Sequence, residues 1–520
     1  MSKRDFKVTY ATLSSPSPRL HDMFDEAVER AREQFGQTFP MYIDGEERKA
    51  DETYTKYSPV DLDLELAHFQ KGTEQDARDA IAAARAAFPS WSRTPWQERV
   101  RLMRKAADLI SDRLFDIAAV MSLEVGKNRL EALGDVEETA DLIRYYCQQM
   151  EENNGFIVEM DAESERHHNR SVLRPYGVWA VISPFNFPFA LAGGPSGGAL
   201  VAGNTVVFKP ASDTAYSGWL LTQCIRDAGV PDGVFNFVTG GGRTVGQTIV
   251  DHPDIAGITF TGSYEVGMDI YRKFAQGKYP RPCIAEMGGK NPSIISDSAD
   301  LDKAATGVMR SAFGLQGQKC SANSRVYVHE DVKSEFMDKL VDLTSKIKVG
   351  DPSKKENWMG PVINKGAYED YRRFVKDLSE NGDIVYGGHV IEDGNGYYVA
   401  PTIVDNLPHN HPLWKHEMFL PIVTIHEIDD LDDAMEKANG VDYGLTAGFY
   451  GEDEDEIDWF LDKIEAGVVY VNREAGATTG AWPGYQPFGG WKGSGSTGKA
   501  GGGRYYVQQY MHEQSQTVID

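Results

Sequence analysis

The sequence predicts an α/β protein with two sheets that are covered by helices. Short β-branched runs alternate with helical segments from about residue 177, and a similar alternation begins near residue 291. The chain has 520 residues, of which 41% are hydrophobic and 25% charged. This composition is that of an ordinary globular protein, and the length is sufficient for several hydrophobic cores. We therefore expect more than one α/β domain.

The first 150 residues are predicted to be mainly helical. In TEQDARDAIAAARAAF, Thr73 and Asp76 have the spacing of a capping box, and apolar residues then recur at helical intervals. The stretch QERVRLMRKAADLISDRLFDIAAVMSLEVGK continues this periodicity. These segments are expected to form helices.

Two series of apolar runs predict the sheets. The first series is VWAVIS, TVVFK, GVFNFV, GITFTG and PCIAEMG, and its spacing is that of βαβ units in a parallel sheet. The second series is NPSIIS, SRVYVHE, IVTIHEI and AGVVYVN, with LDKAATGVMRSAFG as a helix after the first run. Loops at the ends of such strands commonly carry active sites.

Charge and cysteine content exclude several classes of function. The 78 acidic and 53 basic residues give a net charge of -25, which opposes binding to nucleic acid or to anionic membranes. The four cysteines lack paired spacing, which favours a reducing compartment. The N-terminus has no continuous apolar stretch of the signal-peptide kind, so we expect a cytoplasmic protein. Residues 179–208 are apolar, but prolines interrupt them, so we expect no membrane helix.

Three motifs offer candidate binding or catalytic groups. In ITFTGSYEVG, Gly262 and Ser263 lie between a strand and a helix, where free N–H groups can bind a pyrophosphate, although a structural turn explains the pattern equally well. In VVFKPAS, Lys209 ends a strand where α/β sheets bind ligands, although a solvated lysine is commoner. In IAEMGGKNP, burial of Glu286 after its strand would raise its pKa and suit a general base; a helix cap or an ion pair is the alternative.

The cysteines and histidines are the candidates for nucleophilic and metal chemistry. In FGLQGQKCSANSR, Cys320 is either a reactive thiol or a small buried apolar residue. We expect Cys147, Cys224 and Cys283 to be structural, because they lie within predicted helices or a strand. The twelve histidines show no metal-ligand spacing, so no metal is predicted.

Seven motifs together resemble the aldehyde dehydrogenase superfamily: SPFNFPF, VVFKPAS, FTGSYEVG, AEMGGKNP, GQKCSANSR, KHEMFLPIV and YQPFGGWKGSG. The resemblance covers nearly all of residues 70–510. It implies the aldehyde dehydrogenase fold, with a Rossmann-like NAD(P)-binding domain (1–165 and 178–288), an α/β catalytic domain (289–485) and a small β oligomerisation flap (166–177 and 486–520). It also implies a homodimer or a larger homo-oligomer that oxidises a small-molecule aldehyde to a carboxylate.

The resemblance gives the catalytic residues their expected roles. Cys320 matches the nucleophile that forms a thiohemiacetal with the aldehyde and later a thioester. Asn186 matches the side chain that stabilises the oxyanion together with the backbone N–H of Cys320. Glu286 matches the base that activates water for hydrolysis of the thioester. Thus the resemblance favours a reactive Cys320.

The resemblance also implies a dinucleotide site. Lys209 and Glu417 match residues that hold the two riboses, Phe419 matches a residue near the nicotinamide, and Ser263, after Gly262, matches a pyrophosphate contact.

Two positions depart from the common pattern of the superfamily. Ser212 replaces a glutamate that bonds the adenosine ribose and repels the 2′-phosphate of NADP, so NADP is an alternative cofactor, although NAD is still favoured. Leu420 replaces a glycine and is expected to alter the packing of the loop beside Glu417.

Subfamily features resemble the L-glutamate γ-semialdehyde dehydrogenases. They are SPFNFP, Ser321 directly after the nucleophile, and TTGAWPGYQPFGGWKGSGSTGKAGG. This resemblance implies that Ser321 and the N–H groups of Gly480 and Ala481 bind the α-carboxylate of L-glutamate γ-semialdehyde, which is oxidised to L-glutamate in proline catabolism. The loop that carries Gly480 is a few residues longer than usual.

Four other functions are alternatives to this one. An aldehyde dehydrogenase for another semialdehyde or an aromatic aldehyde would retain Cys320 and Glu286. Glu286 argues against a CoA-acylating enzyme, and no histidine is placed to activate Cys320 in a thiol hydrolase. A non-catalytic structural or binding protein on this fold is a remote alternative, because Cys320, Asn186 and Glu286 are all present.

Overall fold

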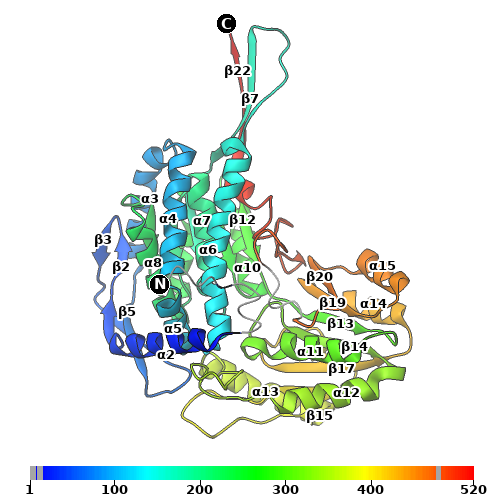
Figure 1. Cartoon of the computed structure of the whole chain (residues 1–520). Coiled ribbons are helices and arrows are strands. Elements are labelled where there is room, and N and C mark those ends of the chain that lie inside the picture. Colours follow the sequence, from blue (N-terminus) through cyan, green and yellow to red (C-terminus); the bar gives the residue numbers. More distant parts are fainter. Residues whose placement is uncertain (1–7, 9–15, 476–481) are drawn as a thin grey trace.

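The computed structural model describes residues 8, 16–475 and 482–520. Within them the chain forms two large sheets of seven strands each and three smaller sheets. Each large sheet and its helices form one lobe, and a narrow β arm projects from the first lobe (Figure 1).

The first large sheet contains the parallel strands predicted after residue 177. Its strands lie in the order β12 (Cys283–Glu286), β11 (Ile255–Thr261), β8 (Val178–Ile182), β9 (Thr205–Lys209), β10 (Phe235–Phe237), β2 (Met41–Ile43) and β3 (Glu46–Arg48). The strands β8 to β12 are parallel, whereas β2 and β3 add an antiparallel hairpin. The order reverses between β8 and β11, because β9 lies on one side of β8 and β11 on the other. Ligands bind at the carboxyl ends of strands at such a switch point.

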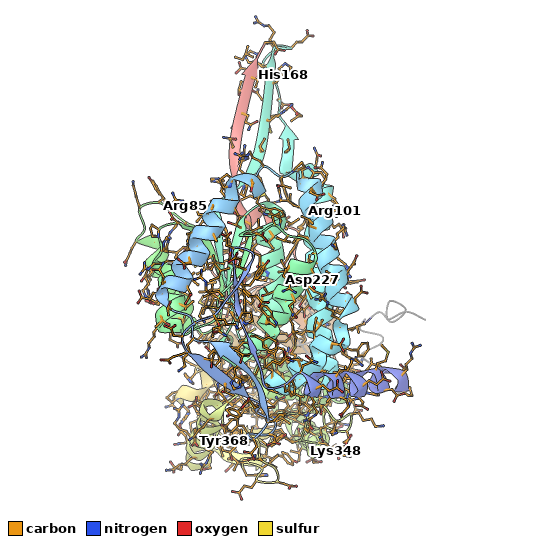
Figure 2. All side chains as sticks on the ribbon, turned by 90° about the vertical axis from the view of Figure 1, so that its left-hand side faces the viewer. Arg85, Arg101, His168, Asp227, Lys348 and Tyr368 are labelled. Atoms are coloured by element: carbon orange, nitrogen blue, oxygen red, sulfur yellow. The ribbon has the colours of Figure 1, made fainter. Side chains whose placement is uncertain are left out.

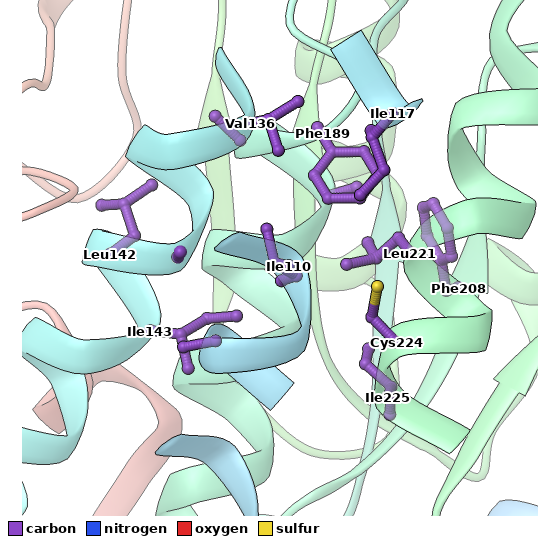
Figure 3. Close-up of a cluster of buried hydrophobic side chains, with 14 of the residues drawn as sticks. Ile110, Ile117, Val136, Leu142, Ile143, Phe189, Phe208, Leu221, Cys224 and Ile225 are labelled. Carbon is purple, nitrogen blue, oxygen red and sulfur yellow. The ribbon is translucent and has the colours of Figure 1, made fainter. Parts of the chain in front are cut away.

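Helices cover both faces of this sheet, and those on one face form the largest hydrophobic core. They are α2 (Pro18–Glu33), α3 (Glu74–Trp91), α4 (Trp96–Asp112), α5 (Leu114–Val125), α6 (Arg129–Glu152), α7 (Ala190–Ala202), α8 (Ala215–Asp227), α9 (Gln247–Asp251) and α10 (Tyr264–Ala275). Ile110 of α4, Leu142 of α6 and Leu221 of α8 belong to this core (Figure 3). The predicted capping box of Thr73 and Asp76 is present at the start of α3.

The prediction of a mainly helical N-terminal region was incomplete. Besides β2 and β3, the region contains a small sheet of β1 (Gln37–Phe39), β5 (Glu65–Gln70) and β4 (Thr53–Tyr57). These strands have three to six residues, and their short, partly polar sequences lack a clear period. One signal was available, because Asp44 and Gly45 both have positive φ in the turn between β2 and β3, and Asp-Gly favours such hairpin turns.

The second large sheet contains the strands of the second predicted series. Their order is β15 (Asp383–Tyr386), β16 (Thr402–Asp405), β17 (Ile422–Ile428), β14 (Asn323–His329), β13 (Asn291–Ile295), β19 (Thr446–Tyr450) and β20 (Val468–Val471). All neighbours are parallel except β15 and β16. Helices of this lobe are α11 (Leu301–Phe313), α12 (Glu330–Ser345), α13 (Lys365–Asn381), α14 (Leu431–Asn439) and α15 (Glu454–Lys463). The strands β15, β16 and β19 were not predicted.

The arm is an antiparallel sheet of β6 (Ile157–Glu159), β7 (His167–Pro175) and β22 (Met511–Ile519). Residues of β22 pair with β7 along its whole length, from Met511 opposite Pro175 to Ile519 opposite His167. Figure 2 shows His168 at the outer end of the arm, far from Lys348 in the second lobe. The β character predicted for the segments around β7 and β22 is therefore confirmed.

The apolar stretch 179–208 consists of β8, α7 and β9 rather than one long helix. In the part of the chain that the structure describes, no helix combines the length and the hydropathy needed to cross a membrane. Cys147, Cys224 and Cys283 are buried in α6, α8 and β12, as expected of structural cysteines.

Candidate active site

The candidate active site lies where the two lobes meet. Asn186 follows β8, Glu286 ends β12, and Cys320 lies on the loop before β14. The side-chain amide of Asn186 donates a hydrogen bond to the backbone oxygen of Gln318 at 3.0 Å. The pKa of the Cys320 thiol is raised by burial, by the charge of Glu417 and by the charge of Glu286, so the Glu286 carboxyl group lies near the thiol. The structure thus brings together the three residues that were predicted from the sequence to be catalytic.

Asn291, the first residue of β13, fixes the backbone around Cys320. Its Nδ2 donates to the carbonyl oxygens of Cys320 (2.7 Å) and Ala322 (2.9 Å), and its Oδ1 accepts from the N–H of Thr446 (3.0 Å). A Cβ atom at Gly289 would lie 2.3 Å from the Cys320 carbonyl oxygen, so only glycine fits there. The nucleophile loop is therefore tied to three strands of the second sheet.

The turn before Cys320 has an unusual backbone. Leu315 and Gln316 are buried and have φ values of 48° and 57°, a region that is costly for residues with a side chain. Three hydrogen bonds of the Gln316 amide offset the cost of this backbone conformation. Its Nε2 donates to the carbonyl oxygens of Gly126 (2.9 Å) and Pro361 (2.6 Å), and its Oε1 accepts from the N–H of Gly360 (3.3 Å). Gln316 therefore links this turn to the loop between α5 and α6.

Cys320 is a partly buried residue whose thiol group strongly disfavours ionisation. Burial raises its pKa to about 12, with further increases from the negative charges of Glu417 and Glu286, while the backbone N–H groups of Ser321 and Cys320 act in the opposite direction. The cysteine is therefore a thiol at neutral pH in this state. Any group that neutralises the two carboxylates would favour the thiolate.

Glu286 is a buried carboxyl group with spare hydrogen-bonding capacity. Burial raises its pKa to about 8, and the N–H of Gly490 lowers it to a smaller extent. Its Oε2 is buried and has no hydrogen-bond partner among the described residues. The raised pKa agrees with the expectation from its place after an apolar strand.

Lys209 and Ser212 occupy the end of β9 and the turn that follows. The Lys209 amine is buried and donates to the Pro210 carbonyl oxygen at 3.1 Å, and burial lowers its pKa to about 8. Ser212 is exposed at the start of a short 3₁₀ helix, and its carbonyl oxygen accepts from the Tyr54 hydroxyl at 3.2 Å. An ammonium group has three donors, so Lys209 retains two for a ligand.

Gly262 and Ser263 form the turn between β11 and α10. The N–H of Gly262 donates to the backbone oxygen of Glu286 at 3.1 Å. Ser263 is the N-cap of α10, and its hydroxyl accepts from the N–H of Val266 at 3.4 Å. This is the strand–turn–helix arrangement that the sequence predicted.

Glu417 lies in the segment before β17 and contacts the loop between β12 and β13. Its Oε1 accepts from the N–H of Gly289 at 2.8 Å. Burial raises its pKa to about 7, opposed by the Gly289 N–H and by Lys290, while Glu265 raises it further.

Phe419 and Leu420 follow Glu417. The Phe419 ring contacts Phe185 edge to face, with centroids 5.9 Å apart, so it lies beside the loop that carries Asn186. Leu420 is buried in the core of the second lobe, and its carbonyl oxygen would lie 2.2 Å from a Cβ at Gly317. The leucine is therefore accommodated by burial, while its backbone packs against the turn before Cys320.

An acidic face on α6 was missed by the sequence analysis. Glu131, Asp135 and Glu138 follow helical spacing, and this spacing was the available signal. Glu131 pairs with Lys319, the residue before the nucleophile, at 2.9 Å, and Asp135 pairs with the fully buried Lys127 at 2.7 Å. Burial raises the pKa of Glu138 to about 8, and the charge of Asp135 raises it further. Several charged groups thus lie on one side of Cys320.

The buried pair of Lys127 and Asp135 also contacts the Asn186 segment. The Lys127 amine lies 3.7 Å from the centroid of the Phe187 ring, and Asp135 accepts from the N–H of Ala190 at 2.7 Å. This pair therefore holds both sides of the segment between β8 and α7.

The predicted substrate contacts are only partly described. Ser321 is buried, and its carbonyl oxygen accepts from the Thr446 hydroxyl at 3.3 Å. Gly480 and Ala481 lie outside the described residues.

A separate group of potential metal ligands lies in the second lobe. Ligand atoms of Asp297, His329 and Asp331 lie within 4.8 Å of one another, and both aspartates are exposed. His329 Nδ1 accepts from the N–H of Asp331 at 3.3 Å, which makes it the cap of α12. Nothing else at this cluster points to an ion, and the sequence-based expectation that the protein binds no metal stays a prediction.

Comparison with known proteins identifies the family. A sequence profile of the aldehyde dehydrogenase family matches residues 46–516. The 1-pyrroline-5-carboxylate dehydrogenase of Staphylococcus aureus (strain MW2) is 37% identical over 490 residues, which are 94% of each chain. The enzyme of that name from Geobacillus sp. (strain WCH70) is 36% identical over 96% of each chain. A crystal structure of 1-pyrroline-5-carboxylate dehydrogenase from Thermus with bound NAD is similar at a TM-score of 0.93 and 33% identity, covering 97% of this chain and 98% of that chain.

The chain therefore belongs to the aldehyde dehydrogenase family, and its fold is the aldehyde dehydrogenase fold. Both expectations drawn from the seven motifs are confirmed.

The electrostatics of the site predict how fast Cys320 reacts with a neutral alkylating agent such as iodoacetamide. Because the negative charge of Glu286 raises the thiol pKa, Glu286→Gln should lower that pKa and increase the alkylation rate at pH 9 to 10 by about threefold, equivalent to half a pKa unit. The rate would be followed by mass spectrometry of the Cys320 peptide. Glu454→Gln, an exposed change on α15, is the control and should leave the rate unchanged. A slower reaction of Glu286→Gln would contradict the charge effect.

Proposed function

We propose that this protein oxidises L-glutamate γ-semialdehyde to L-glutamate with NAD, as a step of proline catabolism. The single observation that carries the chemistry is the convergence of Cys320, Glu286 and Asn186 at the junction of the two lobes. The substrate is supported by the names of the relatives, because 1-pyrroline-5-carboxylate is the cyclic, dehydrated form of glutamate γ-semialdehyde. An aldehyde dehydrogenase for another semialdehyde is the second candidate.

In the first step, the Cys320 thiol gives up its proton to solvent water, and the thiolate sulfur attacks the aldehyde carbon. A C–S bond forms as the π bond of the carbonyl group breaks. The aldehyde oxygen then carries negative charge. Asn186 has a second amide N–H besides the one bonded to Gln318, and this N–H and the backbone N–H of Cys320 would stabilise the charge. One such donor contributes about 3 kcal/mol to stabilisation of the transition state.

The residues at the carboxyl edge of the first sheet fit NAD. Lys209 is buried with two spare donors at the end of β9. Gly262 and Ser263 form a strand–turn–helix junction after β11, two strands away at the same edge of the sheet. Lys209 and Glu417 would hold the riboses, and Ser263 the pyrophosphate. Phe419 would pack near the nicotinamide, and NADP remains an alternative because Ser212 carries no charge. NAD, when bound, accepts the hydride from the former aldehyde carbon, and the adduct on Cys320 becomes a thioester.

In the last step, the Glu286 carboxylate takes a proton from a water molecule, whose oxygen attacks the thioester carbon. The C–S bond breaks, the electron pair returns to the sulfur of Cys320, and the carboxylic acid leaves. Only the ionised form of Glu286 can accept this proton. Since its pKa is about 8, hydrolysis should slow as the pH falls below 8.

Recognition of the substrate would use its two charged groups. The Ser321 hydroxyl and the N–H groups of Gly480 and Ala481 would bind the α-carboxylate. Glu131 and Asp135 of the acidic face are paired with lysines, whereas the half-buried Glu138 is paired with none in the described part of the chain. The ionised form of Glu138 would attract a positive ammonium group. A simple aliphatic aldehyde would use neither feature.

The wider organisation is proposed from the family pattern. The NAD-binding domain would comprise 1–165 and 178–288, the catalytic domain 289–485, and the flap 166–177 and 486–520. The arm exposes apolar side chains, among them Val158, Val518 and Ile519, and has open strand edges. A second copy of the chain would cover them, so we infer a homodimer or a larger homo-oligomer. The unpaired spacing of the cysteines favours the cytoplasm.

Replacement of the two central residues should separate the two halves of the reaction. Cys320→Ala should abolish NADH formation while leaving NAD binding nearly unchanged, because the thiol acts only on the aldehyde. Glu286→Gln should give a burst of about one NADH per site and then stall as a thioester. Stopped-flow absorbance would record both, and mass spectrometry would detect the acyl-enzyme. Normal turnover by Glu286→Gln would remove this residue from the role of base.

The carboxylate anchor can be tested by comparing substrates. Ser321→Ala should lose a charge-assisted hydrogen bond of about 1.5–3 kcal/mol, which is roughly a 10- to 150-fold fall in kcat/KM for glutamate γ-semialdehyde. Activity on an uncharged aliphatic aldehyde of similar length should barely change. An equal loss on both substrates would mean that Ser321 only supports Cys320.

Oligomerisation can be tested through the arm. Multi-angle light scattering at micromolar concentration should show a dimer or a larger species. Val518→Asp should weaken it, because a charge would be placed in a covered apolar surface. Leu461→Asp, at a similarly exposed leucine of α15, is the control. An active wild-type monomer would contradict the proposal.

A further inference from the structure

A chain of buried, hydrogen-bonded side chains runs from Trp179 on β8 to Tyr506. Trp179 Nε1 donates to Thr259 Oγ1 at 2.9 Å, Thr259 Oγ1 lies 3.2 Å from the Tyr510 hydroxyl, and Tyr510 donates to the Tyr506 hydroxyl at 2.9 Å. All four side chains are buried. The chain links β8 and β11 to the segment before β22.

The hydrogen bonds of this chain run in one direction. Because the hydrogen of the Tyr510 hydroxyl is given to Tyr506, the contact between Thr259 and Tyr510 must be a donation by Thr259. Each group thus donates to the next, and the chain ends at Tyr506. The hydroxyl hydrogen of Tyr506 has no acceptor among the described residues. A buried O–H without an acceptor is costly, so it should find one when the site is at work.

Strand register places Glu286 on the same face of the sheet as these hydroxyls. On β11 and β12, Thr259 lies opposite Ile284 and Thr261 lies opposite Glu286. Side chains two residues apart on a strand point to the same face, so Glu286 points to the face of Ile284. Ile284 packs in the same core as Tyr506 and Tyr510, whereas Ala285 packs in the core on the opposite face.

The electrostatic effects agree with this placement. Burial is the main cause of the raised pKa values of Tyr506 and Tyr510, and the negative charge of Glu286 is the smallest of the further effects that raise both. Glu286 in turn has a buried Oε2 that lacks a hydrogen-bond donor among the described residues. An unfilled donor and an unfilled acceptor therefore lie on one face of the sheet.

We propose that the Tyr506 hydroxyl is a positioning residue that donates a hydrogen bond to the ionised Glu286 carboxylate. The bond would hold the carboxylate at the end of the chain from Trp179 and stabilise its charged form. This role rests on the proposed function of Glu286 as the base that activates water. Loss of the hydroxyl should therefore raise the pKa of Glu286 and impair hydrolysis of the thioester without affecting attack by Cys320.

Other titratable groups lie near Tyr506 and Glu286. Cys320 lies on the loop before β14, and Tyr510 is in the chain itself. Tyr146 of α6 stacks on Tyr506 with centroids 5.1 Å apart, and its hydroxyl accepts from the N–H of Gly502 at 3.0 Å. Glu138 lies beyond Tyr146 and raises its pKa, a smaller effect than burial. Tyr146 thus offers a matched control, because it is an equally buried tyrosine of the same cluster that is not part of the directed chain.

The test compares the wild type with Tyr506→Phe and Tyr146→Phe from pH 6 to 10, with glutamate γ-semialdehyde and NAD. For Tyr506→Phe we expect an unchanged NADH burst and an apparent pKa of the hydrolysis rate raised by about one unit. At pH values well below the wild-type pKa, the steady-state rate of Tyr506→Phe should be about tenfold lower than that of the wild type. At pH 10 it should approach the wild-type rate. Recovery at high pH is a readout that a general folding defect would not give.

The outcomes separate this role from the proposed function. A superimposable pH profile for Tyr506→Phe, or an equal shift in Tyr146→Phe, would overturn the role of Tyr506. Normal hydrolysis by Glu286→Gln, or no aldehyde oxidation by the wild type, would instead overturn the proposed function. If Tyr506→Phe does not fold, Tyr510→Phe, which removes the donor to Tyr506, should give a smaller shift in the same direction, and its absence would also overturn the role.

Discussion

The hydrogen bonds of the Asn291 side chain are the constraint on which the rest of the site depends. One amide group holds the carbonyl oxygens on both sides of Ser321 and accepts from the backbone of β19. Since Asn291 begins β13 only a few residues after Glu286 ends β12, the same short segment sets the position of the carboxyl group and of the thiol. This segment therefore joins the carboxyl group at the end of the first sheet to the loop that carries the thiol.

A second set of contacts acts on the other side of the nucleophile. Gln316 holds a strained turn through backbone groups of distant loops, and the ion pair of Lys319 and Glu131 joins the next residues to α6. Cys320 is thus fixed by the second sheet after it and by helices of the first lobe before it. In its proposed role as nucleophile, a cysteine fixed in this way needs little reorganisation when the aldehyde arrives.

Much of the fold could be predicted because most strands of the two large sheets after residue 177 are apolar runs with regular spacing. The hairpin and small sheet before residue 71 could not, since strands such as Glu46–Arg48 are short and polar and are stabilised by distant partners. Cys320, Asn186 and Glu286 were found through motifs. Asn291, Gln316 and Tyr506 were not, because their importance lies in bonds to backbone or hydroxyl groups that are remote in sequence. The acidic face of α6 could have been found from helical spacing alone.

The packing of Tyr506 and Tyr510 against β8 and α6 has a consequence for the order of assembly during synthesis. Trp179 and Tyr146 emerge from the ribosome long before the segment that covers them. The first lobe therefore cannot complete its core while the second lobe is being translated, and its aromatic surface stays open during that time. Nascent chains arrested before residue 500 should thus be the species on which molecular chaperones act.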